Sequence, residues 1–576
     1  MDINWLHKKR ADQAEIKQLG EDIKIDSILS EILIQRGIKT VEEAKTFFNP
    51  SLDDLHDPFL MKNLKSAAKR LEKAILNKQK IRLLGDYDVD GTTSVALLYT
   101  YLKDLTDNLS FYVPDRYEEG YGVSQKSVEL AVEDGVELFI TIDCGTKNSL
   151  ELNWLSNRGC DVIVCDHHEP GDELPNGILL NPKQVDCEYP FKDLCGCGVG
   201  YKLLEGYEKL IKKENSTLTS LLDYVAIAIG ADIVSVMGEN RILTHFGMQI
   251  LKDKPRPCFV SLLNSAGKTG DITLTDVVFG IAPRINAAGR IRVASDAVKL
   301  MISEDDKEIT SLALQIEAHN SERKSLDSGI TIEALQQILD NEEYANQSST
   351  VVFHDSWSKG VVGIVASRLI EQHFRPTIVL TEQEGLLTGS ARTVNDFDIH
   401  SALVTCEDLL EKFGGHQHAA GMTLKKENFK AFQKRFDQYV REHILEEDKS
   451  PKLIVDLEIK MTDIFKPGES LAILPRLKRI LDRMEPFGPN NMKPVFLLRG
   501  VCASSVRILK GAHLKLEILH PDYPQVKIPA IGFGHADKED LVASGMEFDL
   551  AFTLEANHWK NRTTLQLSIK DIKEAQ

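Results

Sequence analysis

The chain has 576 residues, of which 42% are hydrophobic and 27% charged, and its formal net charge is −18. This length predicts roughly three to four domains, and the composition is that of a soluble globular protein. The acidic charge excludes a protein coated in basic surface, although a local groove could still bind nucleic acid. We expect no signal peptide and no membrane span, because no run approaches the ~20 apolar residues that a span needs. Nine cysteines without a Cys-x-x-Cys pair indicate reduced thiols and a cytoplasmic location.

The first half of the chain has the pattern of an α/β domain. Residues 1–60 are predicted to form a short helical lead-in, after which strands and helices alternate. This alternation indicates parallel strands with right-handed crossovers, and in such sheets the functional crevice lies beyond the carboxyl ends of the strands. The predicted strands are residues 81–84, 138–142 and 162–165, and the predicted helices are residues 92–102 and 148–158.

The second half begins with a long helical segment. Apolar residues recur at mostly helical spacing over residues 307–343, which predicts one or two long helices joining two lobes. A smaller α/β unit follows, and the remaining strand-like runs, with a hairpin turn at residues 560–562, suit a small barrel or sandwich. We therefore expect domains at residues 61–305, 346–447 and 452–576, with connecting helices at residues 306–345.

Alternate carboxylates follow the first predicted strand, at Asp86, Asp88 and Asp90. Their spacing imitates the calcium loop of an EF-hand. An EF-hand needs a glutamate at its twelfth position, which here is Leu97, and its loop follows a helix rather than a strand. We therefore interpret the segment as a strand-to-helix turn that presents carboxylates to the crevice.

Other apolar runs of this region also end in polar residues. Asp143 ends the second strand, Asp166-His167-His168 ends the third, and Asp232 follows the apolar run 226–231. An acidic residue and two imidazoles after a buried strand are costly to desolvate unless a charged group needs them. A single aspartate at such a place is more often a turn or helix-cap residue than a ligand. Their co-occurrence at four element ends predicts one metal site.

The candidate metal ligands are carboxylates and one imidazole, namely Asp88, Asp90, Asp143, His167 and Asp232. Such an oxygen-rich set favours Mn²⁺ or Mg²⁺ over structural zinc. Because so many carboxylates around one ion would repel one another, we expect two ions that share a bridging aspartate. A paired site of this kind stabilises both the attacking and the leaving oxygen in phosphoryl hydrolysis.

The order of these motifs resembles the DHH phosphoesterase superfamily and, more closely, the RecJ single-strand DNA exonucleases. The resemblance covers nearly the whole chain except residues 1–60 and the loops. The motifs that carry it are residues 85–91, Arg116 with Tyr121-Gly122, residues 141–145, 166–168, 283–290, 389–392, 414–416 and 485–488.

The resemblance implies a fold and an activity. The expected fold class is α/β, with a parallel-sheet DHH domain joined by a long helix to a smaller DHHA1-like domain and followed by an OB-like barrel. The expected activity is 5′-to-3′ hydrolysis of single-stranded DNA by two Mn²⁺ or Mg²⁺ ions, in DNA repair and recombination. The OB-fold would bind single strands, helicases and single-strand-binding protein are expected partners, and we expect a monomer.

The resemblance also assigns roles to individual residues. It makes Asp88, Asp90, Asp143, His167 and Asp232 the metal ligands, with Asp143 bridging. His168 would contact the scissile phosphate, and Asp166 would orient its neighbours. The implied substrate contacts are Arg116, Arg284 or Arg290, Ser390 and Arg392 for the terminal 5′-phosphate, and His416 for another phosphate.

One position departs from the pattern, and several alternatives stay open. Many superfamily members carry a histidine where this chain has Leu84, so ligation of the first ion is in doubt and Asp86 could partly substitute. Arg284 and Arg290 could instead pair with surplus carboxylates. Alternative functions are hydrolysis of short oligonucleotides or cyclic dinucleotides, a pyrophosphatase, and a catalytically inactive scaffold that binds DNA.

Overall fold

The computed structural model describes residues 2–213, 216–291, 293–466, 469, 473–559 and 562–575. The chain divides into two compact units, which are described separately here. The parallel-sheet unit consists of Ala11–Asn320 and Ile480–Lys493. The second unit consists of Met1–Arg10, Ser321–Arg479 and Pro494–Gln576.

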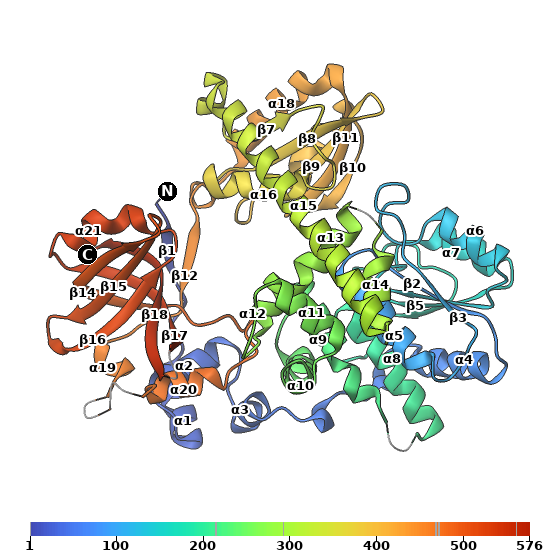
Figure 1. Cartoon of the computed structure of the whole chain (residues 1–576), viewed down its shortest axis with the longest axis horizontal. Helices are drawn as coiled ribbons and strands as arrows, with labels where there is room; N and C mark the ends of the chain where they lie inside the picture. Colours follow the sequence, from blue (N-terminus) through green and yellow to red (C-terminus); the bar gives the residue numbers. More distant parts are fainter. Residues whose placement is uncertain are drawn as a thin grey trace. The chain divides into compact units, whose positions relative to one another are not determined.

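A five-stranded parallel sheet with the order β3-β2-β4-β5-β6 is the centre of the parallel-sheet unit (Figure 1). The predicted strands are all present, and β3 and β6 extend the sheet on either side. The strands are β2 (Ile81–Gly85), β3 (Leu109–Tyr112), β4 (Leu138–Ile142), β5 (Asp161–Cys165) and β6 (Ile178–Leu180).

Helices cover both faces of this sheet, because the buried strands are apolar on both sides. Leu83, Ile140 and Ile163 share one core with residues of α4, α5 and α8, whereas the sequence-adjacent Leu84, Phe139 and Val162 share a second core with residues of α6 and α7. The helices are α4 (Leu64–Leu76), α5 (Val89–Leu102), α6 (Gln125–Glu133), α7 (Ser149–Ser156) and α8 (Gly196–Ile211). The α/β pattern predicted from the sequence is therefore confirmed.

The rest of the parallel-sheet unit is helical. The lead-in contains the predicted helices, but its first residues form a strand, β1 (Asn4–His7), which belongs to the second unit and was not anticipated. The remaining helices are α1 (Gln13–Ile23), α2 (Ser27–Gln35), α3 (Val41–Phe48), α9 (Leu222–Ala231), α10 (Gly238–Asp253), α11 (Pro257–Ser265), α12 (Leu274–Asp276), α13 (Ala282–Ile291) and α14 (Ser295–Ile302).

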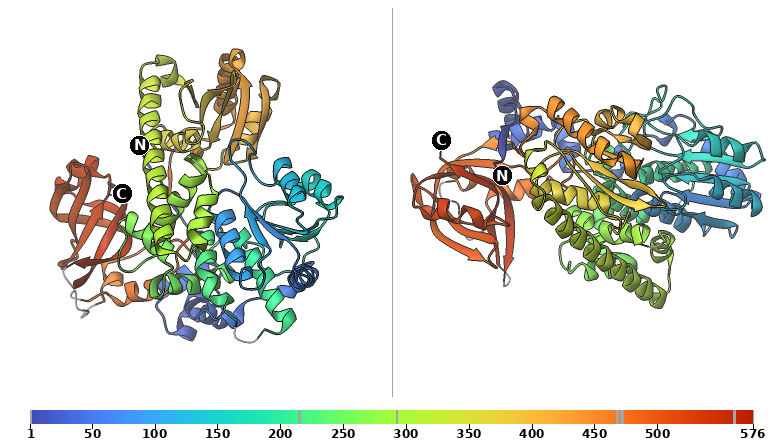
Figure 2. Two further views of the ribbon diagram at one scale, coloured as in Figure 1. Left: turned by 45° about the vertical axis from the view of Figure 1, so that its right-hand side comes forward. Right: turned by 90° about the horizontal axis from the view of Figure 1, so that it is seen from above.

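The predicted long helical segment is a single helix, α15 (Asp306–Leu339), which Figure 2 shows from two further sides. It leads to a mixed sheet with the order β10-β11-β9-β8-β7. The elements of this part are β7 (Thr350–Phe353), β8 (Thr377–Gln383), β9 (Leu386–Arg392), β10 (Leu410–His416), β11 (Ala419–Lys425), α16 (Val362–Gln372), α17 (Ile399–Val404) and α18 (Phe429–His443).

The C-terminal strands close into a barrel, because β14 pairs with both β15 and β17 in the order β14-β15-β16-β18-β17. This closure confirms the predicted barrel. Lys560 and Asn561 of the predicted hairpin turn lie outside the described residues, but the strands on either side pair antiparallel. The barrel strands are β14 (Phe496–Leu509), β15 (His513–His520), β16 (Tyr523–Gly532), β17 (Phe548–Trp559) and β18 (Arg562–Glu574), and β13 (Leu457–Glu458) pairs with β14. The strand β12 (Lys452–Val455) instead pairs with β1, and the helices of this region are α19 (Met461–Ile464), α20 (Arg476–Asp482) and α21 (Glu539–Ala543).

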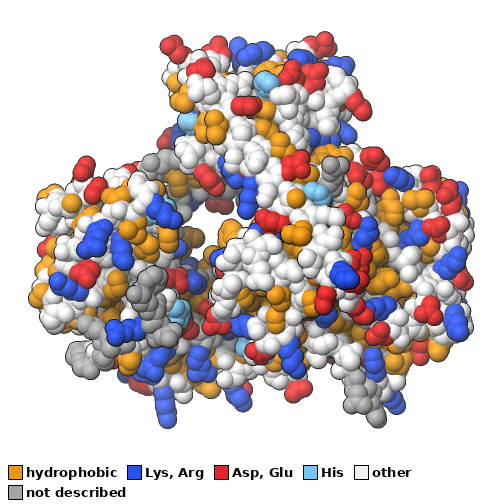
Figure 3. Space-filling model, in the orientation of Figure 1, with side chains coloured by type: hydrophobic (Ala, Val, Ile, Leu, Met, Phe, Trp, Pro, Cys, Tyr) orange, Lys and Arg blue, Asp and Glu red, His pale blue; other side chains and the backbone are white. Residues whose placement is uncertain are grey.

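The surface agrees with the acidic composition. On the face that Figure 3 shows, Lys and Arg side chains are interspersed with Asp and Glu. Among the described helices, none combines the length and the apolar character that crossing a bilayer requires.

Candidate metal centre

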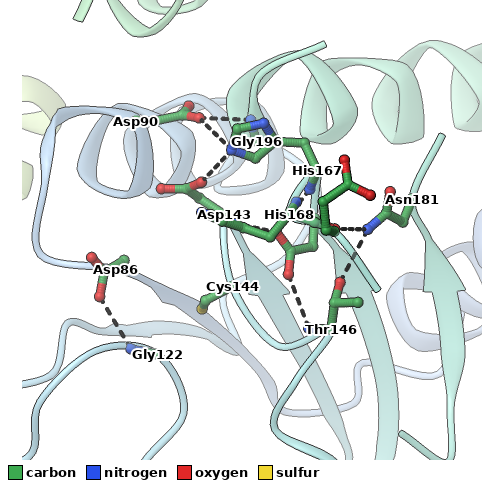
Figure 4. A network of polar contacts seen from close by, with 12 residues as sticks. Asp86, Asp90, Gly122, Asp143, Cys144, Thr146, His167, His168, Asn181 and Gly196 are labelled. Carbon is green, nitrogen blue, oxygen red and sulfur yellow. Dashed lines mark hydrogen bonds and ion pairs between the residues drawn. The ribbon is translucent and has the colours of Figure 1, made fainter. Parts of the chain in front are cut away.

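Polar residues that follow β2, β4 and β5 meet beyond the carboxyl edge of the parallel sheet (Figure 4). Asp232, at the C-cap of α9, joins them. His167 lies at the centre of the group, with its Nε2 atom 3.1 Å from Asp143 Oδ1, 3.6 Å from Asp232 Oδ2 and 3.9 Å from Asp90 Oδ2. Four of the five predicted ligands therefore lie close enough together to bind the same metal ions.

The ligand atoms form two overlapping groups with the spacing that a metal ion needs. In each group the candidate atoms all lie within 4.8 Å of one another. The first group contains Asp143, His167 and His168, and the second contains Asp90, His167 and Asp232. Two neighbouring groups that share a residue are what a paired metal site requires.

The electrostatics of this cluster call for a cation. Burial and the neighbouring carboxylates raise the pKa of Asp90 to about 6 and that of Asp232 to about 8, and they also hold the pKa of Asp143 well above its usual range. Burial lowers the pKa of His167 to about 4, which leaves a neutral ring with a lone pair for a metal. Within the described residues, the buried atoms Asp143 Oδ1 and His167 Nε2 have no hydrogen-bond partner. A divalent ion fits these donors.

The N-terminus of α8 holds Asp90 in place. Asp90 accepts hydrogen bonds from the backbone N–H groups of Gly196, at 2.6 Å, and Cys197, at 2.8 Å. A helix N-terminus stabilises a carboxylate through these N–H groups and the helix dipole. A Cβ atom on Gly196 would lie 2.5 Å from the Cβ atom of Asp143, so only glycine fits between the two ligands.

Asp143 has an unusual backbone conformation, with a φ of 61°. Aspartate tolerates this left-handed region better than most residues. The conformation is fixed on both sides, because Asp143 N donates to Cys165 O at 2.9 Å and the Tyr121 hydroxyl donates to Asp143 O at 2.9 Å. The β4 strand end therefore directs this carboxylate toward His167.

Asp88 and Asp86 differ from the other carboxylates. Asp88 is the N-cap of α5 and accepts a hydrogen bond from Gly91 N at 3.0 Å, so the helix-cap alternative applies to it, and it belongs to neither group of candidate ligand atoms. Its charge nevertheless raises the pKa values of Asp90 and Asp143. Asp86 is buried, and among the described residues its Oδ2 atom has no hydrogen-bond partner. Burial and the charge of Asp88 raise the pKa of Asp86, while Leu84 is wholly buried in the apolar core.

Asp166 organises the His168 side of the site. Its Oδ1 atom accepts from the backbone N–H groups of His167 and His168, at 2.7 and 3.1 Å, and lies 2.8 Å from His168 Nδ1. Although burial opposes ionisation, His168 and Thr146 outweigh it and lower the pKa of Asp166. Burial would likewise lower the pKa of His168, but the contact with Asp166 raises it overall. Asp166 thus holds the His168 ring in place and favours its protonated, positively charged form.

Several residues that support His168 were not predicted as site residues. Asn181 Nδ2 donates to His168 O at 2.8 Å and to Thr146 Oγ1 at 3.2 Å, and the Tyr121 hydroxyl lies 3.2 Å from His168 Nε2. Asn181 directly follows the short apolar run of β6, which is the same strand-end signal that marked Asp143. This signal could have found it.

The predicted phosphate-binding arginines of the parallel-sheet unit separate into two kinds. The Arg116 guanidinium lies 4.8 Å from the centre of the Tyr87 ring, and the charges of Arg116 and Arg290 both act on Tyr87. Arg284 is only 4% exposed and bonds to Gly280 O, Ser265 O and Glu317 Oε2. This placement of Arg284 favours the alternative in which it pairs with a carboxylate inside the protein.

The remaining predicted contacts lie together in the second unit. Arg392 Nη1 donates to Ser390 Oγ at 2.8 Å, and a Cβ atom on Gly363, in the first turn of α16, would lie 2.9 Å from Arg392 Nη2. Arg392 pairs in register with Ala419, which pairs with His416 on the next strand. His416 is exposed, so these three side chains occupy one end of the sheet.

Comparison with protein-family models agrees with this architecture. Residues 80–229 match the N-terminal domain of the DHH family, residues 346–442 match the DHHA1 domain, and residues 469–571 match the RecJ OB domain. The order of these domains, with the carboxylate and histidine cluster at the DHH sheet edge, defines the class of DHH phosphoesterases.

Known proteins resemble the chain over nearly its whole length. It is 36% identical to the single-stranded-DNA-specific exonuclease RecJ of Bacillus subtilis, over 98% of this chain and 70% of that protein. It is 31% identical to the Salmonella typhimurium RecJ, over 98% of each. The crystal structure of RecJ from Thermus thermophilus with Mn²⁺ superposes with a TM-score of 0.83 at 27% identity, and covers 100% of this chain and 80% of that one. The chain therefore belongs to the RecJ family of the DHH superfamily.

Proposed function

We propose that this chain is an exonuclease that hydrolyses single-stranded DNA from its 5′ end with two divalent metal ions, Mn²⁺ or Mg²⁺. The observation that carries the proposal is the buried carboxylate cluster around His167, whose pKa shifts and orphaned ligand atoms call for cations. Its relatives are named single-stranded-DNA-specific exonucleases. When bound at these ligands, divalent ions supply an activated water and neutralise charge on the phosphate.

The protein's own residues complete the chemistry. Asp90, Asp143, His167 and Asp232 are the proposed metal ligands. Asp88 is a further proposed ligand, which would exchange its helix-cap bond for a metal. Asp86 Oδ2, which has no hydrogen-bond partner among the described residues, would assist the first ion.

His168 is the proposed phosphate contact. The bond to Asp166 favours the protonated ring, which stabilises the charge that grows on the phosphoryl oxygens during hydrolysis. Asp166 acts through His168 as a positioning residue, and Tyr121 and Asn181 restrict the ring and backbone of the same residue.

Polarity would come from capture of the terminal 5′-phosphate. The proposed phosphate contacts are Arg116 and Arg290 in the parallel-sheet unit and Ser390, Arg392 and His416 in the second unit. Arginine is suited to this task because its planar guanidinium can bind a phosphate through two hydrogen bonds.

Domains, partners and location complete the proposal. We infer a DHH catalytic domain at residues 61–305, a DHHA1-like substrate-binding domain at residues 346–447 and a strand-binding barrel at residues 452–576. A monomer that cooperates with a helicase and single-strand-binding protein in DNA repair and recombination is the proposed working form. A cytoplasmic location is supported by the nine cysteines, all of them free thiols.

An end-labelled assay tests this proposal. Single strands labelled at the 3′ end should be degraded from the unlabelled end in Mn²⁺ or Mg²⁺, and a chelator should stop the reaction. Release of the 3′ label as the first product would refute the polarity. Parallel reactions with RNA, duplex DNA and dinucleotides distinguish this activity from that of a small-substrate phosphodiesterase.

A further inference from the structure

The residue that follows the metal ligand Asp232 has a strained backbone. Ile233 has a φ of 59°, in the left-handed region, where it ends α9. Helices often end in this conformation, but the residue is then usually glycine or asparagine. A β-branched side chain is a real outlier there, because its Cβ atom crowds the backbone. Such strain calls for a compensating role.

Packing within the protein does not compensate for this strain. The Ile233 side chain is 70% exposed. Among the described residues, the other non-glycine positions with positive φ all carry polar or charged side chains, which tolerate an exposed turn. Ile233 therefore combines strain with an apolar side chain that is left in water.

The loop that follows Ile233 is fixed by hydrogen bonds to residues 489 and 490. Val236 N donates to Pro489 O at 2.9 Å, and Asn490 Nδ2 donates to Ser235 Oγ at 3.0 Å. Val236 itself is wholly buried. Strained residues persist where the surrounding structure over-determines them, and they concentrate at functional sites.

We propose that Ile233 is a substrate-contacting residue whose side chain packs against the nucleoside next to the scissile phosphate. This inference rests on the proposed function. Asp232 Oδ2 lies 3.6 Å from His167 Nε2, and adjacent Cα atoms are about 3.8 Å apart, so a nucleotide held at the metal ligands is within reach of Ile233. Covering an exposed aliphatic side chain contributes roughly a factor of ten or more to binding.

A pair of nearly isosteric variants tests this proposal. Ile233→Leu keeps an apolar side chain, and Ile233→Asn keeps the number of side-chain heavy atoms and tolerates the left-handed backbone but is polar. On single-stranded DNA, Ile233→Asn should lower kcat/KM about tenfold, and Ile233→Leu should stay within about threefold of the wild type. Mn²⁺ affinity, measured by calorimetry, should be unchanged in both.

Lys212→Gly is the matched control, because Lys212 has a φ of 52° at the C-cap of α8. It relieves the same kind of strain elsewhere and should leave kcat/KM unchanged.

A substrate with a terminal abasic nucleotide shows which part of the nucleoside Ile233 contacts. If Ile233 contacts the base, the loss of kcat/KM in Ile233→Asn should disappear on this substrate; if it contacts the sugar, the loss should persist. Both results support the proposal. Wild-type kcat/KM in Ile233→Asn, or a loss matched by weaker Mn²⁺ binding, would overturn it. A wild type that does not cleave single strands would instead refute the proposed function.

Discussion

Two buried clusters of charged residues in the described part of the parallel-sheet unit differ in how their charges are paired. The first is centred on Lys202, which is wholly buried. Its Nζ atom lies 2.8 Å from Glu239 Oε1 and 2.6 Å from Glu205 Oε2, and it donates to His56 O at 2.8 Å. The Tyr189 hydroxyl donates to the other Glu239 oxygen at 2.6 Å. This cluster, the lysine network, satisfies its charges within the protein.

The metal centre has no lysine or arginine paired with its ligands among the described residues, and its neighbouring His168 pairs with Asp166 instead. Its carboxylates face one another and His167, and burial together with this repulsion raises the pKa values of Asp90, Asp143 and Asp232. Burial alone therefore does not mark a functional site, because the lysine network is buried as well. The distinguishing feature is charge that the protein itself leaves unbalanced.

The largest expected effect comes from removing Asp143, the carboxylate that we propose to bridge the two ions. Asp143→Asn should lower exonuclease activity by about a thousandfold or more, since metal catalysis contributes several kcal/mol. The fold should survive, because the change relieves repulsion among buried carboxylates. Activity assays and thermal melts of the purified variant check both parts, and retained nuclease activity would contradict the two-metal assignment.

Breaking the lysine network should have the opposite effect, because it should destabilise the fold without removing the metal ligands. Lys202→Met leaves Glu239 buried without its cation, which should destabilise the fold by about 3–5 kcal/mol. Added Mn²⁺ should stabilise the wild type and Lys202→Met by similar amounts through the intact metal centre, so the difference between the two should remain. Denaturant unfolding with and without Mn²⁺ measures it, and an unchanged midpoint would show that the pairing contributes little.

The pH dependence of stability should also separate the clusters. The folded pKa values of Asp90 and Asp232, about 6 and about 8, lie above 3.8, the ordinary pKa of an aspartate side chain. A raised carboxyl pKa stabilises the fold at low pH, and this contribution is lost as the pH rises through the folded pKa. The melting temperature of metal-free protein should therefore fall between about pH 5 and 8.

Mn²⁺ should offset this fall, because it replaces the protons on the carboxylates. Asp143→Asn is the control, since it removes one source of repulsion and should flatten the metal-free profile. Metal-free melting temperatures that do not change over this pH range would contradict the assignment of unbalanced charge.

The smallest effect is expected from the residue that positions His168. Asp166→Asn should lower kcat about 10–100-fold, the usual cost of removing a supporting partner at a metal site. The pH at which activity falls should also shift downward, because Asp166 holds the pKa of His168 up. A pH–rate profile distinguishes this from general destabilisation, which would lower activity without shifting the profile.

Much of this site could be predicted from the sequence, because strand ends of a parallel sheet meet at one edge. That rule alone predicts that Asp90, Asp143 and His167 lie near one another. It could not predict that Gly196 and Cys197 hold Asp90, because that contact joins residues separated by 106 positions or more.

Other features depended on tertiary packing and were not visible in local patterns. Arg284 lies in a motif typical of the family, yet its guanidinium bonds within the protein. The strand Asn4–His7 forms only because it pairs with Lys452–Val455, at the other end of the sequence. In both cases the deciding partner is a residue that sequence spacing cannot identify.

Equilibrium Mn²⁺ binding near neutral pH is the most direct test of the unbalanced-charge account. Free Mn²⁺ can be followed by electron paramagnetic resonance during titration of the wild type, Asp143→Asn and Lys202→Met. Two ions should bind the wild type and folded Lys202→Met, and fewer than two should bind Asp143→Asn, which removes the proposed bridging carboxylate. Equal binding by the wild type and Asp143→Asn would contradict it.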